Sequence, residues 1–199
     1  MGDLESYYHQ ENKFPPLIEV AIIHSYFETI HPYVDGNGRL GRLLITFMLC
    51  EKRIIEKPLL YLSLFFKEHR NEYYELLMNV RFEGNWENWI KFFLRGVRNT
   101  SKQAIETAKE ILNLQKEHKQ IIQSKMSQYK LSYPLYDLFC KNPILSIAHA
   151  ARELNSNYQS IKNLMGNFTK LNIVSKYDDK SRNKLFQYTD YLKILRRGT

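Results

Sequence analysis

HPYVDGNGRLGR, residues 31–42, lies between two segments with helical periodicity, PPLIEVAIIHSYFETI (15–30) and RLLITFMLCEKRI (42–54). In the first segment, apolar residues recur at the three- and four-residue spacing of one helix face, and prolines stand where a helix begins. The second segment is apolar almost all round, as a helix in the middle of a bundle would be. Residues 31–42 are therefore predicted to be a glycine-rich turn between two packed helices, which favours a mainly α fold.

The residue types within this turn point to an anion. Gly36, Gly38 and Gly41 allow positive φ angles and a close approach of backbone to a ligand. Because the segment leads into a helix, its N–H groups converge where the helix dipole favours negative charge. Arg39 and Arg42 are three residues apart, so they share one face of the helix, and guanidinium groups suit phosphate oxygens. The turn is predicted to bind phosphate.

Two further side chains add reactive groups to this phosphate site. Asp35 offers a hard oxygen ligand next to a bound anion, an arrangement in which protein and phosphate share Mg²⁺. His31 ends the preceding helix and is a candidate general base near neutral pH. An anion site, a metal carboxylate, two arginines and a base together predict phosphoryl or nucleotidyl transfer.

Other interpretations of the turn fit less well. GNGRLG satisfies the dinucleotide fingerprint G-x-G-x-x-G, and Glu56 follows at about the expected 20 residues, but that fingerprint needs a preceding strand and here a helical period precedes it. The P-loop and protein-kinase motifs do not occur. A purely structural turn with a capping Asp explains any one of these residues but not their combination.

Composition and charge separate the two halves of the chain. The 199 residues carry 29 Lys and Arg against 21 Asp and Glu, for a net charge of +8. Residues 1–100 hold 12 basic and 13 acidic side chains, whereas residues 101–199 hold 17 and 8. The basic character therefore belongs to the second half, and it concerns the partners of that half only.

The chain shows no signal for a membrane or for export. No apolar run approaches the roughly 18 residues that a membrane span needs, and the N-terminus lacks the pattern of a signal peptide. Cys50 and Cys140 stand in apolar surroundings and are expected to be buried thiols. A cytoplasmic protein without membrane contact is expected.

The remaining segments are also predicted to be largely helical. Residues 63–82 and 86–99 are amphipathic, and residues 101–125 form a charged stretch without Gly or Pro. Further along, helices are expected at 146–155 and 157–172, after a short helix that begins near residue 133. Two short strands around a polar turn at 178–182 complete an order typical of a winged helix-turn-helix, a small α+β domain.

The turn segment resembles the signature of the Fic (Fic/Doc) family, His-Pro-Phe-x-Asp/Glu-Gly-Asn-Gly-Arg-x-x-Arg, with Tyr33 in place of Phe. The flanking segments and the C-terminal winged helix are similar to those of a bacterial subgroup of this family. The resemblance implies a Fic-type helical bundle at residues 1–100, a connecting helix at 101–132 and a winged helix-turn-helix domain at 133–199.

The resemblance implies a protein adenylyltransferase, which moves AMP from Mg-ATP to a Ser, Thr or Tyr hydroxyl of a target protein. By this likeness His31 deprotonates the hydroxyl, and Asp35 holds Mg²⁺ between the α- and β-phosphates. The two arginines of the motif bind the β- and γ-phosphates. Nucleotide binding is assigned to Gly36, Asn37, Gly38, Arg39, Gly41 and Arg42.

A tyrosine pair is the remaining candidate for the nucleotide. Tyr73 and Tyr74 correspond to a pair that helps to line the adenine pocket in relatives, although either one fits equally well as a core aromatic of an amphipathic helix. Some relatives carry Asn where Arg81 stands here, so that adenine contact is not carried over.

Two regulatory features of the family are not found. The inhibitory pattern [Ser/Thr]-x-x-x-Glu-[Gly/Asn] has no match. Glu83-Gly84 and Glu11-Asn12 fit its end, but Asn79 and Tyr7 stand where the pattern requires Ser or Thr. Only 13 residues precede Phe14, so the hairpin flap that aligns the target hydroxyl is expected to be missing. The chain is accordingly expected to be a fragment or a naturally shortened protein.

The second half offers a surface for DNA or for a partner protein. Residues 133–199 hold 11 basic and 5 acidic side chains, which suits contact with a DNA backbone. Winged helices also serve as protein-docking modules, and both interpretations stay open, as does a homodimer. The candidate contacts are Asn157, Tyr158, Gln159, Ser160, Lys162 and Asn163, with Lys176, Lys180, Arg182 and Lys184 on the wing. The alternative function is a DNA-binding regulator whose Fic pocket binds nucleotide without efficient transfer.

Overall fold

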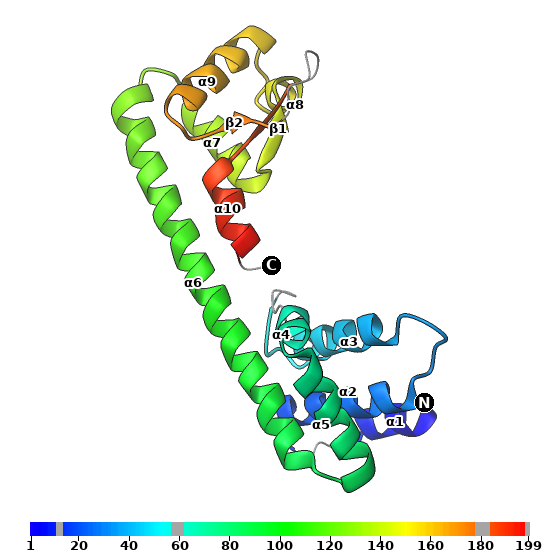
Figure 1. Ribbon diagram of the computed structural model, residues 1–199. Coiled ribbons are helices and arrows are strands. Elements are labelled where there is room, and N and C mark those ends of the chain that lie inside the picture. Colours follow the sequence, from blue (N-terminus) through cyan, green and yellow to red (C-terminus); the bar gives the residue numbers. More distant parts are fainter. Residues whose placement is uncertain (11–13, 57–61, 178–183, 198–199) are drawn as a thin grey trace. The chain divides into compact units, whose positions relative to one another are not determined.

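The computed structural model describes residues 1–10, 14–56, 62–177 and 184–197 (Figure 1). They form two compact units, Met1–Ala104 and Ile105–Thr199. Most of the described residues are helical, and a small antiparallel sheet lies in the second unit. The mainly α fold class is thus confirmed, together with a small α+β unit at the C-terminal end. That this second unit is a winged helix stays a prediction.

The first unit is a bundle of helices. Its elements are α1 (Gly2–Tyr8), α2 (Pro16–Ile30), α3 (Asn37–Glu51), α4 (Leu62–Glu68), α5 (Arg70–Glu83) and the beginning of α6 (Trp86–Met126). Proline at the first position of α2 fits there because its missing N–H would have no partner in the helix. Helix α3, which follows the glycine-rich turn, begins at Asn37, five residues earlier than its apolar pattern predicts. Residues that were expected in the turn therefore form the first part of this helix.

The core of the first unit lies where α2 packs against α3 and α5. The fully buried Trp89 of α6 donates from its indole N–H to the carbonyl oxygen of Ala21 at 2.9 Å, which ties α6 to the same core. Burial of these large aromatic and aliphatic side chains supplies most of the stabilisation of the bundle. The core includes Val20, Ile23, Phe27, Ile45, Leu49, Phe65, Phe66 and Phe93.

Two further expected helix boundaries were wrong. The helix predicted at 63–82 is divided at His69, whose ring nitrogen Nδ1 lies 3.0 Å from the Phe65 carbonyl oxygen. The segments expected at 86–99 and 101–125 form one continuous helix, α6. The Thr100 hydroxyl donates to the Gly96 carbonyl oxygen at 2.8 Å, a bond that a helical Thr readily makes, so the polar residues near position 100 do not interrupt α6.

The second unit combines helices with a three-stranded sheet. After the C-terminal part of α6 come α7 (Ser132–Lys141), β1 (Ile144–Ser146), α8 (Ile147–Glu153), α9 (Tyr158–Lys170), β2 (Ser175–Lys176), β3 (Leu185–Gln187) and α10 (Thr189–Arg197). The strand order is β1-β3-β2 and both pairs are antiparallel, with Leu145 opposite Phe186 and Ser175 opposite Gln187. The two predicted strands are therefore present, and the predicted polar turn between them lies outside the described residues.

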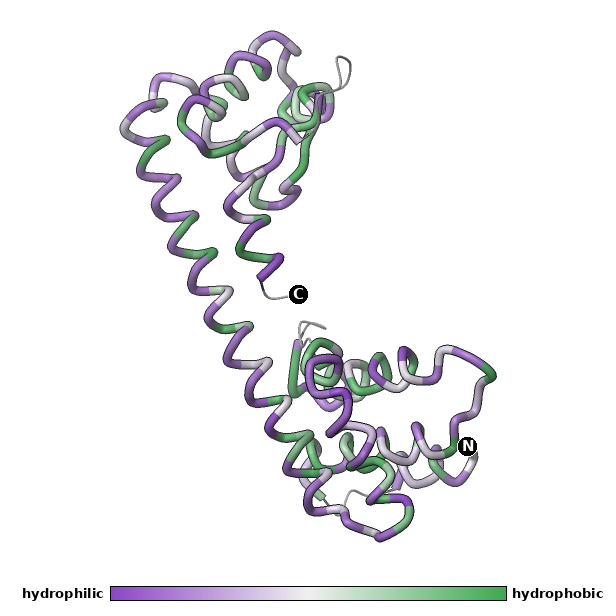
Figure 2. The backbone as a smooth tube through the Cα atoms, in the orientation of Figure 1, coloured by the Kyte–Doolittle hydropathy of each residue, from purple (hydrophilic) through white to green (hydrophobic). Residues whose placement is uncertain are grey.

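The sequence did not reveal β1 or α10. Strand β1 has only three residues and pairs with residues 39 to 43 positions further on, so no local pattern marks it. Helix α10 contributes no fully buried residue. Figure 2 shows hydrophilic residues alternating with apolar ones along α6 and α10, the pattern of helices with one apolar face.

Within the described part of the chain, no helix combines the length and the apolar character that crossing a membrane requires. Cys50 and Cys140 are free thiols and are partly buried.

Candidate active site

The side chain of Asn37 closes the turn between α2 and α3. Its Oδ1 accepts a hydrogen bond from the Tyr33 N–H at 2.9 Å, and its Nδ2 donates to the Tyr33 carbonyl oxygen. Asn37 is only 2% exposed, so these bonds are shielded from water. Both functional groups of the amide are thus engaged with backbone, and Asn37 holds the shape of the loop.

His31 stands at the first position of this turn. It ends α2 in the left-handed conformation (φ 50°, ψ 58°), and its N–H donates to the Phe27 carbonyl oxygen at 3.0 Å. Residues other than Gly adopt this conformation infrequently, and such positions occur often at functional sites. The His31 side chain is exposed, so it is accessible to a reacting group.

Gly36 and Asp35 form the entry to α3. Gly36 caps α3 with a φ of 83°, a conformation that Gly adopts without steric penalty. The Asp35 side chain is 93% exposed; its Oδ1 accepts from the Gly36 N–H at 2.6 Å, and its Oδ2 lies 3.8 Å from Nη2 of Arg39. The carboxylate therefore lies, exposed to solvent, at the N-terminal end of α3.

Both arginines of the motif lie over glycines at this helix end. A methyl group built on Gly36 would lie 3.7 Å from Nη2 of Arg39, and one built on Gly38 would lie 3.1 Å from Nη1 of Arg42. Side chains on a helix lean toward its N-terminus, which explains this placement. Two guanidinium groups thus flank the first N–H groups of α3, which have no acceptor within the helix. Positive charge and N–H donors converge there.

Gly41 has a different place from the other two glycines. It is buried against α2, and a methyl group built on it would lie 2.5 Å from Oε1 of Glu28 and 3.2 Å from the His24 ring. A side chain at this position has no room, so Gly41 permits the close packing of α3 on α2. The structure does not bring it to the exposed end of α3.

A buried polar cluster behind the turn was not predicted. Nδ1 of His24 lies 3.1 Å from the Gly41 carbonyl oxygen, and Nε2 lies 2.9 Å from the Tyr73 hydroxyl. Complete burial lowers the pKa of His24 to about 3. Burial raises the pKa of Glu28, although the nearby Arg42 guanidinium opposes the rise. One sequence feature could have indicated this cluster: His24 and Glu28 are four residues apart on a helix face that is otherwise apolar.

The tyrosine pair is divided between core and surface. Tyr73 is 3% exposed, and burial raises the pKa of its hydroxyl well above the ordinary value. Tyr74 is 51% exposed, and the Arg70 guanidinium lies 5.7 Å from its ring centroid. Only Tyr74 therefore presents its ring at the surface of α5.

The single exposed carboxylate of the site, Asp35, fits a magnesium ion that is shared with the phosphates of a substrate. Among the described residues, no three His, Cys, Asp or Glu side chains are grouped so that they could hold a metal by themselves. Mg²⁺ commonly takes one or two carboxylates and completes its coordination with phosphate oxygens and water. The exposed Asp35 carboxylate beside the N–H groups of α3 meets the protein's part of that requirement.

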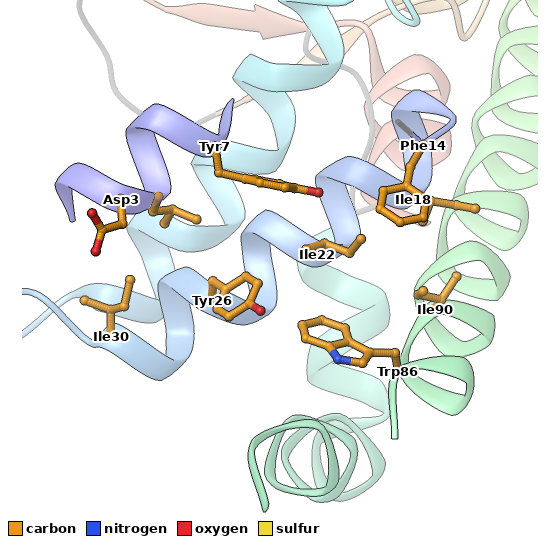
Figure 3. Close-up of a pocket in the computed structure, with 10 residues that line it drawn as sticks. Asp3, Tyr7, Phe14, Ile18, Ile22, Tyr26, Ile30, Trp86 and Ile90 are labelled. Carbon is orange, nitrogen blue, oxygen red and sulfur yellow. The ribbon is translucent and has the colours of Figure 1, made fainter. Parts of the chain in front are cut away.

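A large apolar cavity of the first unit runs along α2, from Ile18 to Ile30 (Figure 3). Its volume is about 670 Å³, and Ile22, Tyr26, Ile30 and Trp86 are among its lining residues. The described residues that line it include Asp3 but no Lys, Arg or His, and none of residues 31–42. This lining does not suit a triphosphate, so the cavity is separate from the candidate anion site.

The candidate contacts on the second unit are only partly available to a ligand. The side chain of Asn157 caps α9 by accepting from the Ser160 N–H at 2.8 Å. Gln159 and Asn163 bond each other at 2.9 Å on the exposed face of α9. Tyr158 and Lys162 are also exposed, as are Lys176 and Lys184 near the strands. Lys180 and Arg182 lie outside the described residues.

Comparison with known proteins supports the likeness of the first half. Residues 1–49 match the Fic/DOC family. A probable protein adenylyltransferase of Aquifex aeolicus (strain VF5) is 50% identical over 34 residues, which are 17% of this chain and 11% of that protein. The protein adenylyltransferase Fic of Aedes aegypti is 33% identical over 94 residues, which are 46% of this chain and 17% of that protein. The chain thus matches less than a fifth of the length of each relative.

Among solved structures, a Fic family protein from Desulfovibrio desulfuricans G20 is similar to this chain with a TM-score of 0.49 and 22% sequence identity. The superposition covers 94% of this chain and 53% of that one.

Proposed function

We propose that the protein is a Fic-type protein adenylyltransferase, which transfers AMP from ATP to a hydroxyl group of another protein. The observation that carries the proposal is the arrangement at the start of α3, where Arg39 and Arg42 lie over Gly36 and Gly38. The exposed His31 is the first residue of the turn that leads into this helix. The match of residues 1–49 to the Fic/DOC family and the relatives named adenylyltransferases support it.

The phosphates of ATP would bind at the N-terminus of α3. The first N–H groups of the helix would donate to phosphate oxygens, and the guanidinium groups of Arg39 and Arg42 would offset the negative charge. Asn37 would act indirectly, because its amide already bonds the backbone of Tyr33 and holds the loop in shape. Preorganised donors of this kind need no rearrangement when charge develops in the transition state.

His31 would remove the proton from the attacking hydroxyl. The hydroxyl oxygen then bonds to the α-phosphorus, the bond from that phosphorus to the bridging oxygen breaks, and pyrophosphate leaves. Asp35 would hold Mg²⁺ together with phosphate oxygens, and the bound ion would neutralise part of the phosphate charge. We place the adenine beside α5, where the Tyr74 ring is exposed.

The test uses the full chain, ATP and Mg²⁺ with a bacterial lysate as the source of acceptor. Two parallel reactions contain ATP radiolabelled on the α-phosphate or on the γ-phosphate, and protein-bound label is measured after gel separation. AMP transfer predicts label on protein from the α-labelled ATP alone. Label from the γ-labelled ATP alone would instead indicate a kinase, and label from neither, with ATP binding retained, would contradict enzymatic transfer.

A second candidate function is DNA binding by the second unit. The observation in its favour is the exposed N-terminal face of α9, where Tyr158 and Lys162 stand free of the core, within the strongly basic half of the chain. In this case the first unit would bind nucleotide without efficient transfer, and the chain would act as a regulator.

An electrophoretic shift of the promoter of the protein's own gene tests this function. Lys162→Glu is expected to weaken binding more than Lys170→Glu, which makes the same charge change at the far end of α9. Equal binding to unrelated DNA of the same length, or no binding, would contradict a specific regulator.

A further inference from the structure

Three helices of the first unit meet at one buried side chain. His24 belongs to α2, contacts the backbone of α3 through Gly41 at 3.1 Å, and contacts α5 through the Tyr73 hydroxyl at 2.9 Å. His24 is fully buried and Tyr73 nearly so, so water does not compete for either bond. The three groups form one continuous chain of hydrogen bonds behind the turn.

The direction of each bond in this chain follows from chemistry. Burial keeps the imidazole neutral, so it carries a single N–H. A carbonyl oxygen can only accept, so the proton lies on Nδ1 and points to Gly41. Nε2 must then accept, and the Tyr73 hydroxyl donates to it. Loss of the Tyr73 hydroxyl would leave Nε2 buried without a partner, which weakens the hold on Gly41.

The same helix carries the proposed general base. His24 and His31 are seven residues apart, which corresponds to two turns of α2 and about 10 Å along its axis. Seven residues return to nearly the same face of a helix. His24, which contacts Gly41, and His31, at the end of the helix, therefore lie on the same side of α2.

The approach of α3 to α2 at this point is unusually close. A methyl group on Gly41 would meet Oε1 of Glu28 at 2.5 Å. That oxygen is buried and has no hydrogen-bond partner among the described residues, and it lies 4.0 Å from Nε2 of His24. The His24 ring, in contrast, contacts the backbone of α3 directly, because its Nδ1 lies 3.1 Å from the Gly41 carbonyl oxygen.

We propose that His24 and Tyr73 are positioning residues, which fix the N-terminal part of α3, with its N–H groups and arginines, relative to the rest of the nucleotide site. This inference rests on the proposed function, because it assigns these two residues a role in binding the phosphates of that nucleotide. Neither residue touches the reacting atoms. A purely structural role would change stability alone, whereas a positioning role changes the recognition of phosphate.

The preference for ATP over adenosine measures phosphate recognition directly. Tyr73→Phe removes only the hydroxyl and keeps the ring, so any contact of the ring with adenine is retained. Tyr136→Phe is the matched control, since the Tyr136 hydroxyl is also buried and lies 2.7 Å from the Tyr188 hydroxyl in the second unit. Affinities for ATP and adenosine are measured by calorimetry with full-length protein, alongside the thermal midpoint.

We expect both variants to lower the thermal midpoint, but only Tyr73→Phe to reduce the ATP preference, by about tenfold. Adenosine affinity should stay the same in both. A folded Tyr73→Phe protein that keeps the full preference overturns the inference while the proposed function stands. Wild-type protein that binds ATP no better than adenosine contradicts the proposed function, and the inference with it.

A second pair of variants separates folding from positioning. His24→Asn retains an amide N–H near the place of Nδ1, whereas His24→Ala retains no donor. We expect His24→Asn to keep more of the ATP preference than His24→Ala. Equal preference in two folded variants would contradict a role for the bond to Gly41.

Discussion

The side-chain amide of Asn37 bonds both the N–H and the carbonyl oxygen of Tyr33, and so closes the turn on which the candidate active site is built. A side chain that satisfies both backbone groups of one residue fixes the path of the loop between them. The exposed His31 precedes this closed turn, and the helix N-terminus with its two arginines follows it. The geometry of the site therefore depends on a residue that is itself buried.

Asn37→Ala removes both bonds and leaves the groups of Tyr33 without these partners. We expect the free energy of unfolding to fall by about 1–3 kcal/mol and ATP affinity to fall with it. Both tryptophans, Trp86 and Trp89, lie in the first unit, so urea unfolding followed by tryptophan fluorescence reports this unit. The control Asn79→Ala changes a partly exposed Asn on α5 and should have a clearly smaller effect; equal losses in both variants would contradict the role of Asn37.

Gly41→Ala tests the close packing of α3 on α2. The new methyl group would meet Glu28, Phe27 and His24 at 2.5–3.2 Å, and overpacking of this kind destabilises by about 1–3 kcal/mol. Gly166→Ala is the matched control, because nothing lies within 4 Å of its added methyl group and Ala favours a helix by roughly 0.5–1 kcal/mol. Thermal unfolding followed by circular dichroism should show opposite shifts. Shifts of the same sign would indicate that α3 has room at this position.

The buried His24 should make the first unit sensitive to acid. Its pKa is lowered by burial from 6.5 to about 3, so below pH 6.5 the unfolded chain binds a proton that the folded chain does not. Stability from this group is therefore lost as the pH falls, by about 2 kcal/mol between neutral pH and pH 5. Glu28, whose pKa burial raises, acts in the opposite direction.

His24→Asn leaves Glu28 in place and removes only the contribution of the imidazole. Its unfolding free energy, measured by urea titration at pH 7 and pH 5, should change less between the two values than that of wild type. Equal changes in the two proteins would show that His24 is not held neutral by the fold.

Arg42→Met tests the charge at the start of α3. Charge-assisted hydrogen bonds contribute about 1.5–3 kcal/mol, so ATP should bind roughly 10- to 100-fold more weakly while adenosine binds as before. Arg95→Met is the control; Arg95 is a partly exposed side chain of the same unit that pairs with Glu72 at 2.6 Å. Calorimetry with both ligands distinguishes the outcomes, and weaker adenosine binding by Arg42→Met would indicate a general loss of structure.

Local features of the sequence predicted the helices that frame the turn. The prolines at 15 and 16 and the apolar spacing of α2 mark that helix, and the glycines and arginines of residues 31–42 mark the candidate anion site. The start of α3 at Asn37 was missed because its first turn is polar and glycine-rich. The continuity of α6 was missed because polar residues near Thr100 resemble a helix end, although they bond to their own helix.

The buried cluster could not be predicted because its partners are far apart in the sequence. His24 contacts Gly41 17 residues away and Tyr73 49 residues away. A periodic pattern identifies which face of a helix is buried, but not which polar side chain on another helix meets it. The same limit applies to Tyr73 and Tyr74, since only the packing of α5 shows which ring is exposed.

The most direct test of the proposed function replaces His31 with Asn, a residue that tolerates the left-handed conformation found at this position. The loop should then keep its shape, so the variant isolates the loss of the base; His9→Asn, at another exposed histidine, is the control. With ATP labelled on the α-phosphate, we expect protein-bound label from wild type and His9→Asn and little or none from His31→Asn, whose ATP affinity should be unchanged. Equal labelling by wild type and His31→Asn would show that His31 is not the general base.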